Sequence, residues 1–249
     1  MQNSLDDILK TKLCAGPLAG ISAAPFRVLP FLLNENWARP DFSCTEMLSA
    51  KHIANGNRQN PRFIVKDKRE GKLCVQLAAN NANDAAIAAE YAINTIGADM
   101  LDLNLGCPKP KIRKKGIGSA LLGNYNKVAQ IIKAIQIDKS IPVLAKIRVD
   151  GASSDSNNLD IAKAIADAGA AALTVHGRNW RDDYATEIHY DQIAKINAAI
   201  PIPVIANGDV FDASSADTMF KKTGCAAVMI RRGMLGKPWV FAEIDAHAN

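Results

Sequence analysis

Short apolar runs alternate with longer amphipathic runs along the whole of this 249-residue chain. The short runs predict strands near Leu13–Pro17, Phe42–Thr45, Leu73–Leu77, Met100–Asn104, Val143–Ile147, Ala172–Val175, Val204–Ala206 and Ala227–Ile230. The longer runs repeat apolar residues on one face and predict helices over Ala85–Ile96, Val128–Ile137, Leu159–Ala168, Tyr190–Ala199 and Ser214–Lys222. The chain therefore alternates strand and helix from end to end.

Eight such strands in a chain of this length predict a closed (β/α)8 TIM barrel, an α/β fold. The competing architecture is a doubly wound open sheet, which normally has fewer strands and a GxGxxG fingerprint after the first one. No such fingerprint follows Leu13–Pro17. Because no linker or low-complexity segment divides the chain, we expect one barrel domain over residues 1–249.

Unusual polar residues fall at or just beyond the carboxyl ends of the predicted strands. They are Glu46, Gln76, Asn104, Lys146, Arg148, His176, Arg178, Asn207, Gly208, Asp209, Arg231 and Arg232. A single residue of this kind is more often structural than functional. The carboxyl ends of barrel strands meet on one face, which carries the chemistry of such folds. Because these polar residues recur at the same end of so many strands, we predict one site on that face.

Composition narrows the functional classes only slightly. Hydrophobic residues make up 48% and charged residues 22% of the chain, as in soluble globular proteins with a large core. The net charge of +5 permits nucleic-acid binding without requiring it. Five of the seven residues from Lys109 to Lys115 are basic. This basic segment, with Lys111, Lys114 and Lys115, is suited to contacts with nucleic-acid phosphates, and a solvated turn is the alternative.

The five cysteines form no CxxC pair and no zinc-site spacing, so we expect no metal. An odd number of cysteines without a disulfide framework predicts a reducing compartment. We see no apolar region typical of a signal peptide and no run long enough to span a membrane. These features predict a cytoplasmic protein that does not enter a membrane, and we expect a monomer.

The most informative stretch runs from Asp102 to Leu122. An apolar strand ends at Asn104, a tight turn presents Cys107, and the basic segment leads through glycines into a helix. A thiol on a loop beside an amide and several cations is typical of reactive cysteines, although an inert loop cysteine is the alternative. This stretch resembles the signature of the tRNA-dihydrouridine synthases, flavoenzymes that reduce particular uridines in tRNA. The resemblance extends from about Ala15 to Phe241, with its motifs in family order.

The resemblance implies a mechanism and a set of roles. NADPH reduces FMN, a hydride passes to C6 of a uracil, and Cys107 is the catalytic proton donor to C5. The residues implied to bind the cofactor are Pro17, Leu18, Ala19, Gln76, Lys146, His176, Asn207, Gly208, Asp209, Arg231 and Arg232. Those implied to contact the tRNA substrate are Glu46, Asn104, Arg148, Arg178, Lys111, Lys114 and Lys115.

Two departures from the family pattern leave alternatives open. Arg231 stands where the family has glycine, which predicts weaker FMN binding. The family's C-terminal helical domain is expected to be absent or truncated, because the sequence stops one helix after Pro238-Trp239. One alternative is a catalytically impaired RNA-binding relic. Another is a different barrel enzyme, either an FMN-dependent oxidoreductase or a Schiff-base aldolase using Lys146. A yellow protein would exclude the aldolase and weaken the relic.

Overall fold

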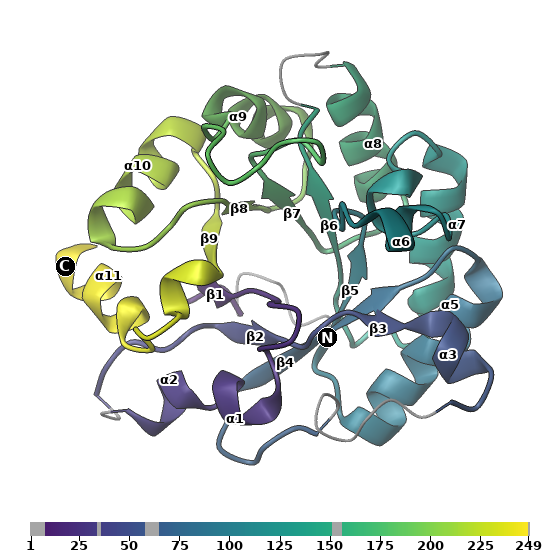
Figure 1. The fold of residues 1–249 in the computed structure, drawn as a ribbon, viewed down its shortest axis with the longest axis horizontal. Coiled ribbons are helices and arrows are strands. Elements are labelled where there is room, and N and C mark those ends of the chain that lie inside the picture. Colours follow the sequence, from purple (N-terminus) through teal and green to yellow (C-terminus); the bar gives the residue numbers. More distant parts are fainter. Residues whose placement is uncertain (1–7, 34–35, 58–64, 151–155, 249) are drawn as a thin grey trace.

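The computed structural model describes residues 8–33, 36–57, 65–150 and 156–248. Within these residues a ring of parallel strands is surrounded by helices (Figure 1). The strands are β1 (Leu13–Ala15), β2 (Phe42–Cys44), β3 (Leu48–Ser49), β4 (Lys72–Ala78), β5 (Met100–Asn104), β6 (Val143–Arg148), β7 (Ala172–His176), β8 (Val204–Asn207) and β9 (Ala227–Ile230). Strand β2 pairs with both β1 and β4, which closes the ring, while the two-residue β3 pairs only with β4. The predicted TIM barrel is confirmed.

Helices cover the outside of the ring (Figure 1). They are α1 (Ala24–Arg27), α2 (Leu29–Leu32), α3 (Ala50–Ala54), α5 (Ala82–Tyr91), α6 (Pro110–Arg113), α7 (Tyr125–Ile135), α8 (Ser156–Asp167), α9 (Tyr190–Ala199), α10 (Ala213–Thr223) and α11 (Val240–Ala248). A π-helical turn over Ala92–Ile96 extends α5, and 3-10 turns cover Gly118–Leu121 and Arg232–Met234. All five predicted helices occur: α9 has the predicted boundaries, and side-chain caps set the starts of α5, α7 and α10. For example, the Asp212 carboxylate accepts the Ser215 N–H at 2.8 Å and starts α10.

Side chains alternate between the two faces of each strand and form two apolar cores. The larger core lies between the strands and the helices. The smaller core fills the barrel interior and includes Cys14, Phe42, Cys74 and Met100. Ile8 and Leu9, which precede β1, also pack into this inner core. The interior is thus apolar apart from the inward residues nearer the carboxyl ends of the strands.

Strand register brings the polar residues of neighbouring strands together. Asn104 of β5 is paired with Lys146 of β6, and Arg148 of β6 with His176 of β7. His176 is in turn paired with Asn207 of β8. The polar residues at the carboxyl ends of β5, β6, β7 and β8 therefore lie side by side on the face predicted from the sequence.

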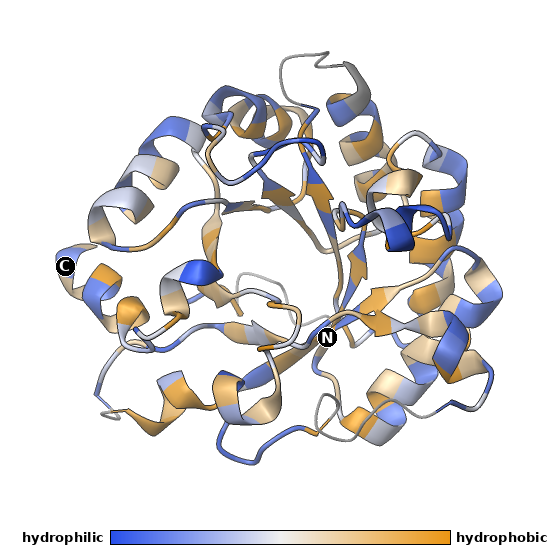
Figure 2. Cartoon of the chain, in the orientation of Figure 1, coloured by the Kyte–Doolittle hydropathy of each residue, from blue (hydrophilic) through white to orange (hydrophobic). Residues whose placement is uncertain are grey.

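Polar residues otherwise lie mainly on the outer surfaces of the helices and on the turn that contains α6 (Figure 2). A buried ion pair at 2.8 Å joins Arg27 of α1 to Glu70, just before β4. No helix in the described part of the chain is long and apolar enough to cross a membrane.

Candidate active site

A cavity of about 520 Å³ opens at the carboxyl ends of the barrel strands. It brings together most of the predicted site residues: Pro17, Leu18, Ala19, Gln76, Asn104, Cys107, Lys146, Arg148, His176, Arg231 and Arg232. Met47, Ile112 and Tyr184 also line it. The residues come from the carboxyl ends of nearly all barrel strands, as their positions in the sequence predicted.

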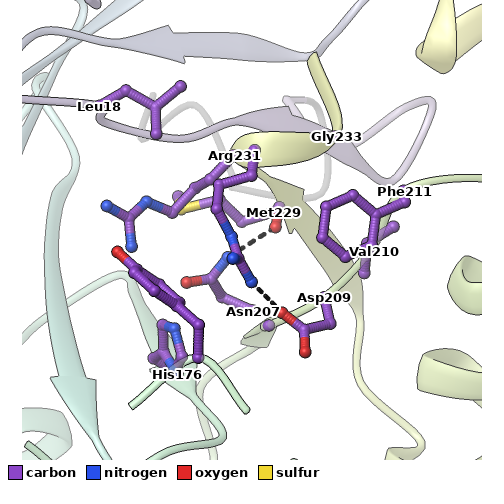
Figure 3. A pocket seen from close by; sticks show the side chains of 12 residues that line it. Leu18, His176, Asn207, Asp209, Val210, Phe211, Met229, Arg231 and Gly233 are labelled. Atoms are coloured by element: carbon purple, nitrogen blue, oxygen red, sulfur yellow. Dashed lines mark hydrogen bonds and ion pairs between the residues drawn. The ribbon is translucent and has the colours of Figure 1, made fainter. Parts of the chain in front are cut away.

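A narrower cavity of about 30 Å³ adjoins the first and is lined by the predicted phosphate loop, Asn207, Gly208 and Asp209 (Figure 3). His176, Arg231 and Arg232 belong to the walls of both cavities. The two spaces are therefore parts of one site, wide beside Cys107 and narrow beside the phosphate loop.

Hydrogen bonds fix the amides on the floor of the wide cavity. Gln76 donates through Nε2 to Asp102 Oδ2 at 2.7 Å and accepts at Oε1 from Asn104 Nδ2 at 2.8 Å. Asp102 is fully buried, and burial raises its pKa to about 6, although the Gln76 hydrogen bond and the charge of Lys146 act in the opposite direction. The Gln76 amide is thus held in one orientation, with one N–H and one lone pair left for a ligand.

Lys146 presents a buried ammonium to the wide cavity. Its Nζ donates to Asn207 Oδ1 at 2.8 Å, and Asn207 Nδ2 donates to the Met229 carbonyl at 2.7 Å. Burial lowers the pKa of Lys146, and the charges of Arg231 and Arg148 lower it further. Lys146 has two N–H donors left for a ligand. A negatively charged ligand atom beside it would favour the protonated, charged form of the lysine.

His176 is held as a hydrogen-bond acceptor on one side of its ring. Its Nδ1 accepts the Arg178 N–H at 3.1 Å. Burial lowers its pKa, and the charges of Lys146 and Arg148 act in the same direction. The imidazole is therefore neutral at physiological pH, and Nε2 is the nitrogen that carries its proton.

The Cys107 loop is held from several sides. Asn104 Oδ1 accepts the Cys107 N–H at 3.0 Å, and Arg148 Nε donates to the Gly106 carbonyl at 2.7 Å. The Cys107 carbonyl accepts from Ser119 Oγ at 2.9 Å. Cys107 is half-buried at the cavity wall, whereas Cys14, Cys44, Cys74 and Cys225 are buried, and all five are free thiols. Cys107 is thus the accessible thiol, and its backbone is fixed.

The arginines at the narrow end bind protein groups. Arg178 is 3% exposed, forms an ion pair with Asp209, and donates through Nε to the Thr186 carbonyl at 2.6 Å. Arg232 donates to Asp209 Oδ1 at 2.5 Å and lies 4.1 Å from the centre of the Tyr184 ring. Arg178 lies outside the walls of both cavities, so the structure gives it a role in holding the loop after β7.

Arg231 extends across the site. Its Nε donates to the Pro17 carbonyl at 2.8 Å, so the side chain from β9 reaches the loop after β1. The contact is close, because a Cβ added to Gly16 would lie 2.7 Å from Arg231 Cγ. The side chain forms part of the wall between the wide and narrow cavities.

Four other predicted residues lie outside the cavity walls. The Glu46 carboxylate accepts the Gly20 N–H at 2.7 Å and fixes the loop after β1. Lys111, Lys114 and Lys115 are exposed on α6 and the turn that follows it. The structure places these lysines on the surface next to the site.

Sequence reasoning missed Tyr184 and Asp102. Tyr184 lies in the middle of a long loop and has no strand-end position to mark it. Asp102 lies inside an apolar strand run, which could have identified it, since a carboxylate buried there needs a partner.

The residues of the wide cavity fit a flavin mononucleotide ring. Gln76 offers a fixed amide edge with both a donor and an acceptor, Lys146 offers a cation, and Leu18 and Met47 offer apolar surface. The narrow end fits less well, because Arg231 and Arg232 fill the space beside Asp209. The wide cavity thus offers the groups that a flavin ring needs, with Arg231 in the wall towards the phosphate loop.

A TIM barrel with a wide cavity at the carboxyl ends of its strands, lined by a held thiol loop and a buried lysine, has the architecture of a barrel enzyme. A family model described as "Dihydrouridine synthase (Dus)" matches residues 13–249. The chain belongs to the dihydrouridine synthase family, which is FMN-dependent in general.

Curated relatives agree with this assignment. The chain is 36% identical to tRNA-dihydrouridine synthase B of Vibrio vulnificus (strain CMCP6) over 236 residues, which are 95% of this chain and 71% of the relative. It is 36% identical to the protein of the same name from Proteus vulgaris over 242 residues, 97% of this chain and 73% of the relative. A third such protein, from Pseudomonas aeruginosa, is 35% identical over 95% of this chain and 70% of its own length.

Proposed function

We propose that this protein reduces uridines in tRNA to 5,6-dihydrouridine, with FMN as cofactor and NADPH as reductant. The observation that carries the proposal is the accessible thiol of Cys107, held at the wall of a cavity that also presents Gln76, Lys146 and His176. The family and the named substrate of the relatives support it. A tRNA substrate agrees with the cytoplasmic location predicted from the free cysteines.

The residues of the wide cavity would hold the flavin. When bound and reduced by NADPH, FMN supplies the hydride that is added to C6 of the uracil. Gln76 would bind the pyrimidine edge of the ring, and Lys146 would hold negative charge at the same end. Pro17, Leu18 and Ala19 would lie against the ring, and Asn207, Gly208 and Arg232 would hold the phosphate.

Cys107 would donate its proton to C5 of the uracil as general acid. Its backbone is fixed on the N–H side by Asn104 and on the carbonyl side by Ser119, so its thiol needs little reorganisation to reach one position. The remaining N–H groups of Asn104 and Arg148 would bind the uracil oxygens. The amide and guanidinium thus hold the loop and the base together.

The uridine must leave its stack to enter the cavity, as bases do in enzymes that modify them. The exposed lysines at 111, 114 and 115 would bind the phosphates on either side of the flipped nucleotide. We propose that this surface, together with Arg148, forms the RNA-facing side of the site.

The proposal is tested with Cys107→Ala. The variant should bind FMN and oxidise NADPH like the parent, while dihydrouridine formation in tRNA falls by about 10²-fold or more, the contribution typical of general acids. Cys107→Ser is the matched control of size and polarity and should also be impaired, because an alcohol is a much weaker acid. Parental tRNA reduction by the alanine variant would exclude Cys107 as the acid.

The ion pair of Arg232 with Asp209 keeps the RNA-binding relic as a second candidate, because it closes the phosphate end. Purified protein incubated with FMN and freed of excess ligand separates the two. A yellow protein that oxidises NADPH supports the enzyme, whereas a colourless protein that binds tRNA supports the relic.

A further inference from the structure

Two sets of contacts connect the loop after β7 to the loop that carries Cys107. Asn179 and Trp180 follow β7, while Gly106 and Cys107 follow β5. In one connection, Arg148 donates through Nη1 to the Asn179 carbonyl at 3.2 Å and through Nε to the Gly106 carbonyl at 2.7 Å. Arg148 therefore joins the two loops directly.

The second connection runs through a stacked arginine. Arg113, the last residue of α6, lies with its Cζ 3.4 Å from the centre of the Trp180 ring. Its Nη1 donates to Ser119 Oγ at 2.8 Å. Ser119 Oγ donates to the Cys107 carbonyl at 2.9 Å, and the Ser119 N–H reaches the same oxygen at 3.2 Å. The path Trp180–Arg113–Ser119 thus ends on Cys107 itself.

Backbone packing makes this end of the path rigid. Gly118 has φ +66°, and a Cβ added there would lie 2.9 Å from the Cys107 carbonyl oxygen and 3.0 Å from Cys107 Cβ. The Gly118–Ser119 segment therefore lies directly against Cys107, and a shift of Ser119 must shift the cysteine.

We propose that Trp180 and Arg113 are positioning residues that hold the Cys107 thiol for proton transfer. The inference rests on the proposed function, because the proton transfer is part of it. An arginine on a short surface helix loses rotamer freedom when it binds, and stacking on an indole offsets that cost. The stack therefore keeps Arg113 on Ser119, and Ser119 keeps the Cys107 backbone in place.

Arg181 provides a matched control for this clamp. Its Cζ lies 4.4 Å from the centre of the same indole ring, yet it has no hydrogen bond to Ser119 or Cys107 among the contacts of the described residues. Removing either arginine takes one cation from the ring, but only Arg113 connects the ring to the cysteine.

The test is the rate at which iodoacetamide alkylates Cys107 in the folded protein loaded with FMN. The other four cysteines are buried, and mass spectrometry identifies the labelled residue. Trp180→Ala and Arg113→Gln should raise the rate about two- to thirty-fold, the range that corresponds to loss of a cation–π contact. Trp180→Phe keeps an aromatic face and should restore most of the protection, while Arg181→Ala should match the parent.

Turnover gives the second readout. Trp180→Ala should lower kcat for tRNA reduction with KM nearly unchanged, since the clamp acts on the thiol and not on RNA binding. Arg113→Gln should lower kcat in the same way, and because it also removes a charge from the basic segment, only its kcat is used for this comparison. Parental alkylation rates in both variants, or an equal change in Arg181→Ala, would overturn the proposal. If Trp180→Ala does not fold, Arg113→Gln and Ser119→Ala decide the matter.

The clamp and the proposed function can fail separately. Alkylation measures the environment of the thiol without tRNA or dihydrouridine. If Cys107→Ala keeps full activity while the clamp variants still expose the thiol, the function is wrong and the clamp remains. If Cys107→Ala is inactive and the alkylation rates do not move, the function remains and the clamp is wrong.

Discussion

At the scale of single residues, Arg231 departs most clearly from the family pattern. It connects β9 to the Pro17 carbonyl and forms part of the wall between the two cavities. Burial lowers its pKa, and the neighbouring charge of Arg232 acts in the same direction. The bulk of the side chain should weaken binding of an anionic cofactor, whereas its positive charge should strengthen it.

We expect Arg231→Gly to bind FMN about ten-fold more tightly or better. FMN binding to the parent must break the Arg231–Pro17 hydrogen bond and move the side chain from its close contact with Gly16. A hydrogen bond to a charged group is worth about 1.5–3 kcal/mol, which exceeds the roughly 1 kcal/mol that a partly solvated ion pair to phosphate returns. Quenching of FMN fluorescence during titration gives the dissociation constants.

Arg231→Lys is the control for charge, because it keeps a cation and most of the chain length. Its affinity should stay close to that of the parent. Equal or weaker binding by the glycine variant would make Arg231 a phosphate ligand, and the steric argument would be wrong.

The sequence predicted most of the residues that line the cavity, but it did not predict which groups each side chain binds. Gln76, Lys146 and His176 were placed at the cavity because strand-end positions face one way in a barrel. Arg178 has an equally favourable position, yet it turns away to bind Asp209 and a loop carbonyl. That choice depends on the path of residues 179–189, which carries no periodic pattern to predict it.

At the scale of elements, the basic segment folds as the short helix α6, with Pro110 in its first turn. Ile112 faces the cavity, while Lys111, Lys114 and Lys115 are exposed. The segment thus has one side at the cavity wall and another, with the three lysines, on the surface.

Replacing Lys111, Lys114 and Lys115 together by glutamine should flatten the salt dependence of tRNA binding. Each lost phosphate contact removes about 0.7–0.9 from the slope of log affinity against log salt. The measurement is a set of tRNA dissociation constants at several KCl concentrations. The same change at Lys133, Lys139 and Lys163, which are exposed on and after outer helices, controls for net charge. Equal slopes in the two triple variants would show that Lys111, Lys114 and Lys115 do not bind tRNA phosphates.

Strands were predicted more accurately than short helices. Barrel strands are buried on both faces, so each stands out as a continuous apolar run. Elements such as α1, α2, α3 and α6 span five residues or fewer, too few for a helical period to appear. Prolines start α1, α2 and α6, and the Ser49 side chain caps α3.

At the scale of the whole molecule, closure of the ring decides which groups lie in the interior. The count of strands predicted closure, and the β2–β4 pairing confirms it. Closure also puts Asp102 inside the barrel between the apolar core and the polar floor of the cavity, with 3% of its surface exposed. Because burial raises its pKa in the folded state, the ionisation of Asp102 is linked to unfolding.

Asp102→Asn should change the pH dependence of stability. Burial raises the pKa of Asp102 to about 6 from the model-compound value of 3.8, so between these values the folded state holds a proton that the unfolded state releases. The contribution of Asp102 to stability is therefore fully present below about pH 4 and is lost as pH rises through about 6. The loss is about 3 kcal/mol by pH 7, and the asparagine variant, which cannot ionise, should avoid it.

Urea unfolding of both proteins from pH 4 to pH 7 measures this difference, since groups that do not interact with Asp102 contribute equally to each and cancel. Lys146 does interact with Asp102, so the difference reports the Asp102–Lys146 pair. Asparagine adds two N–H donors, which shift the variant by an amount that does not depend on pH. Gln76 can still donate to its carbonyl oxygen, so the floor of the cavity keeps its main contact. Asp191→Asn, on the exposed surface of α9, is the matched control and should run parallel to the parent. If Asp102→Asn also runs parallel, the carboxylate is stabilised in the folded barrel by Lys146 more strongly than burial penalises it, and its pKa is not raised.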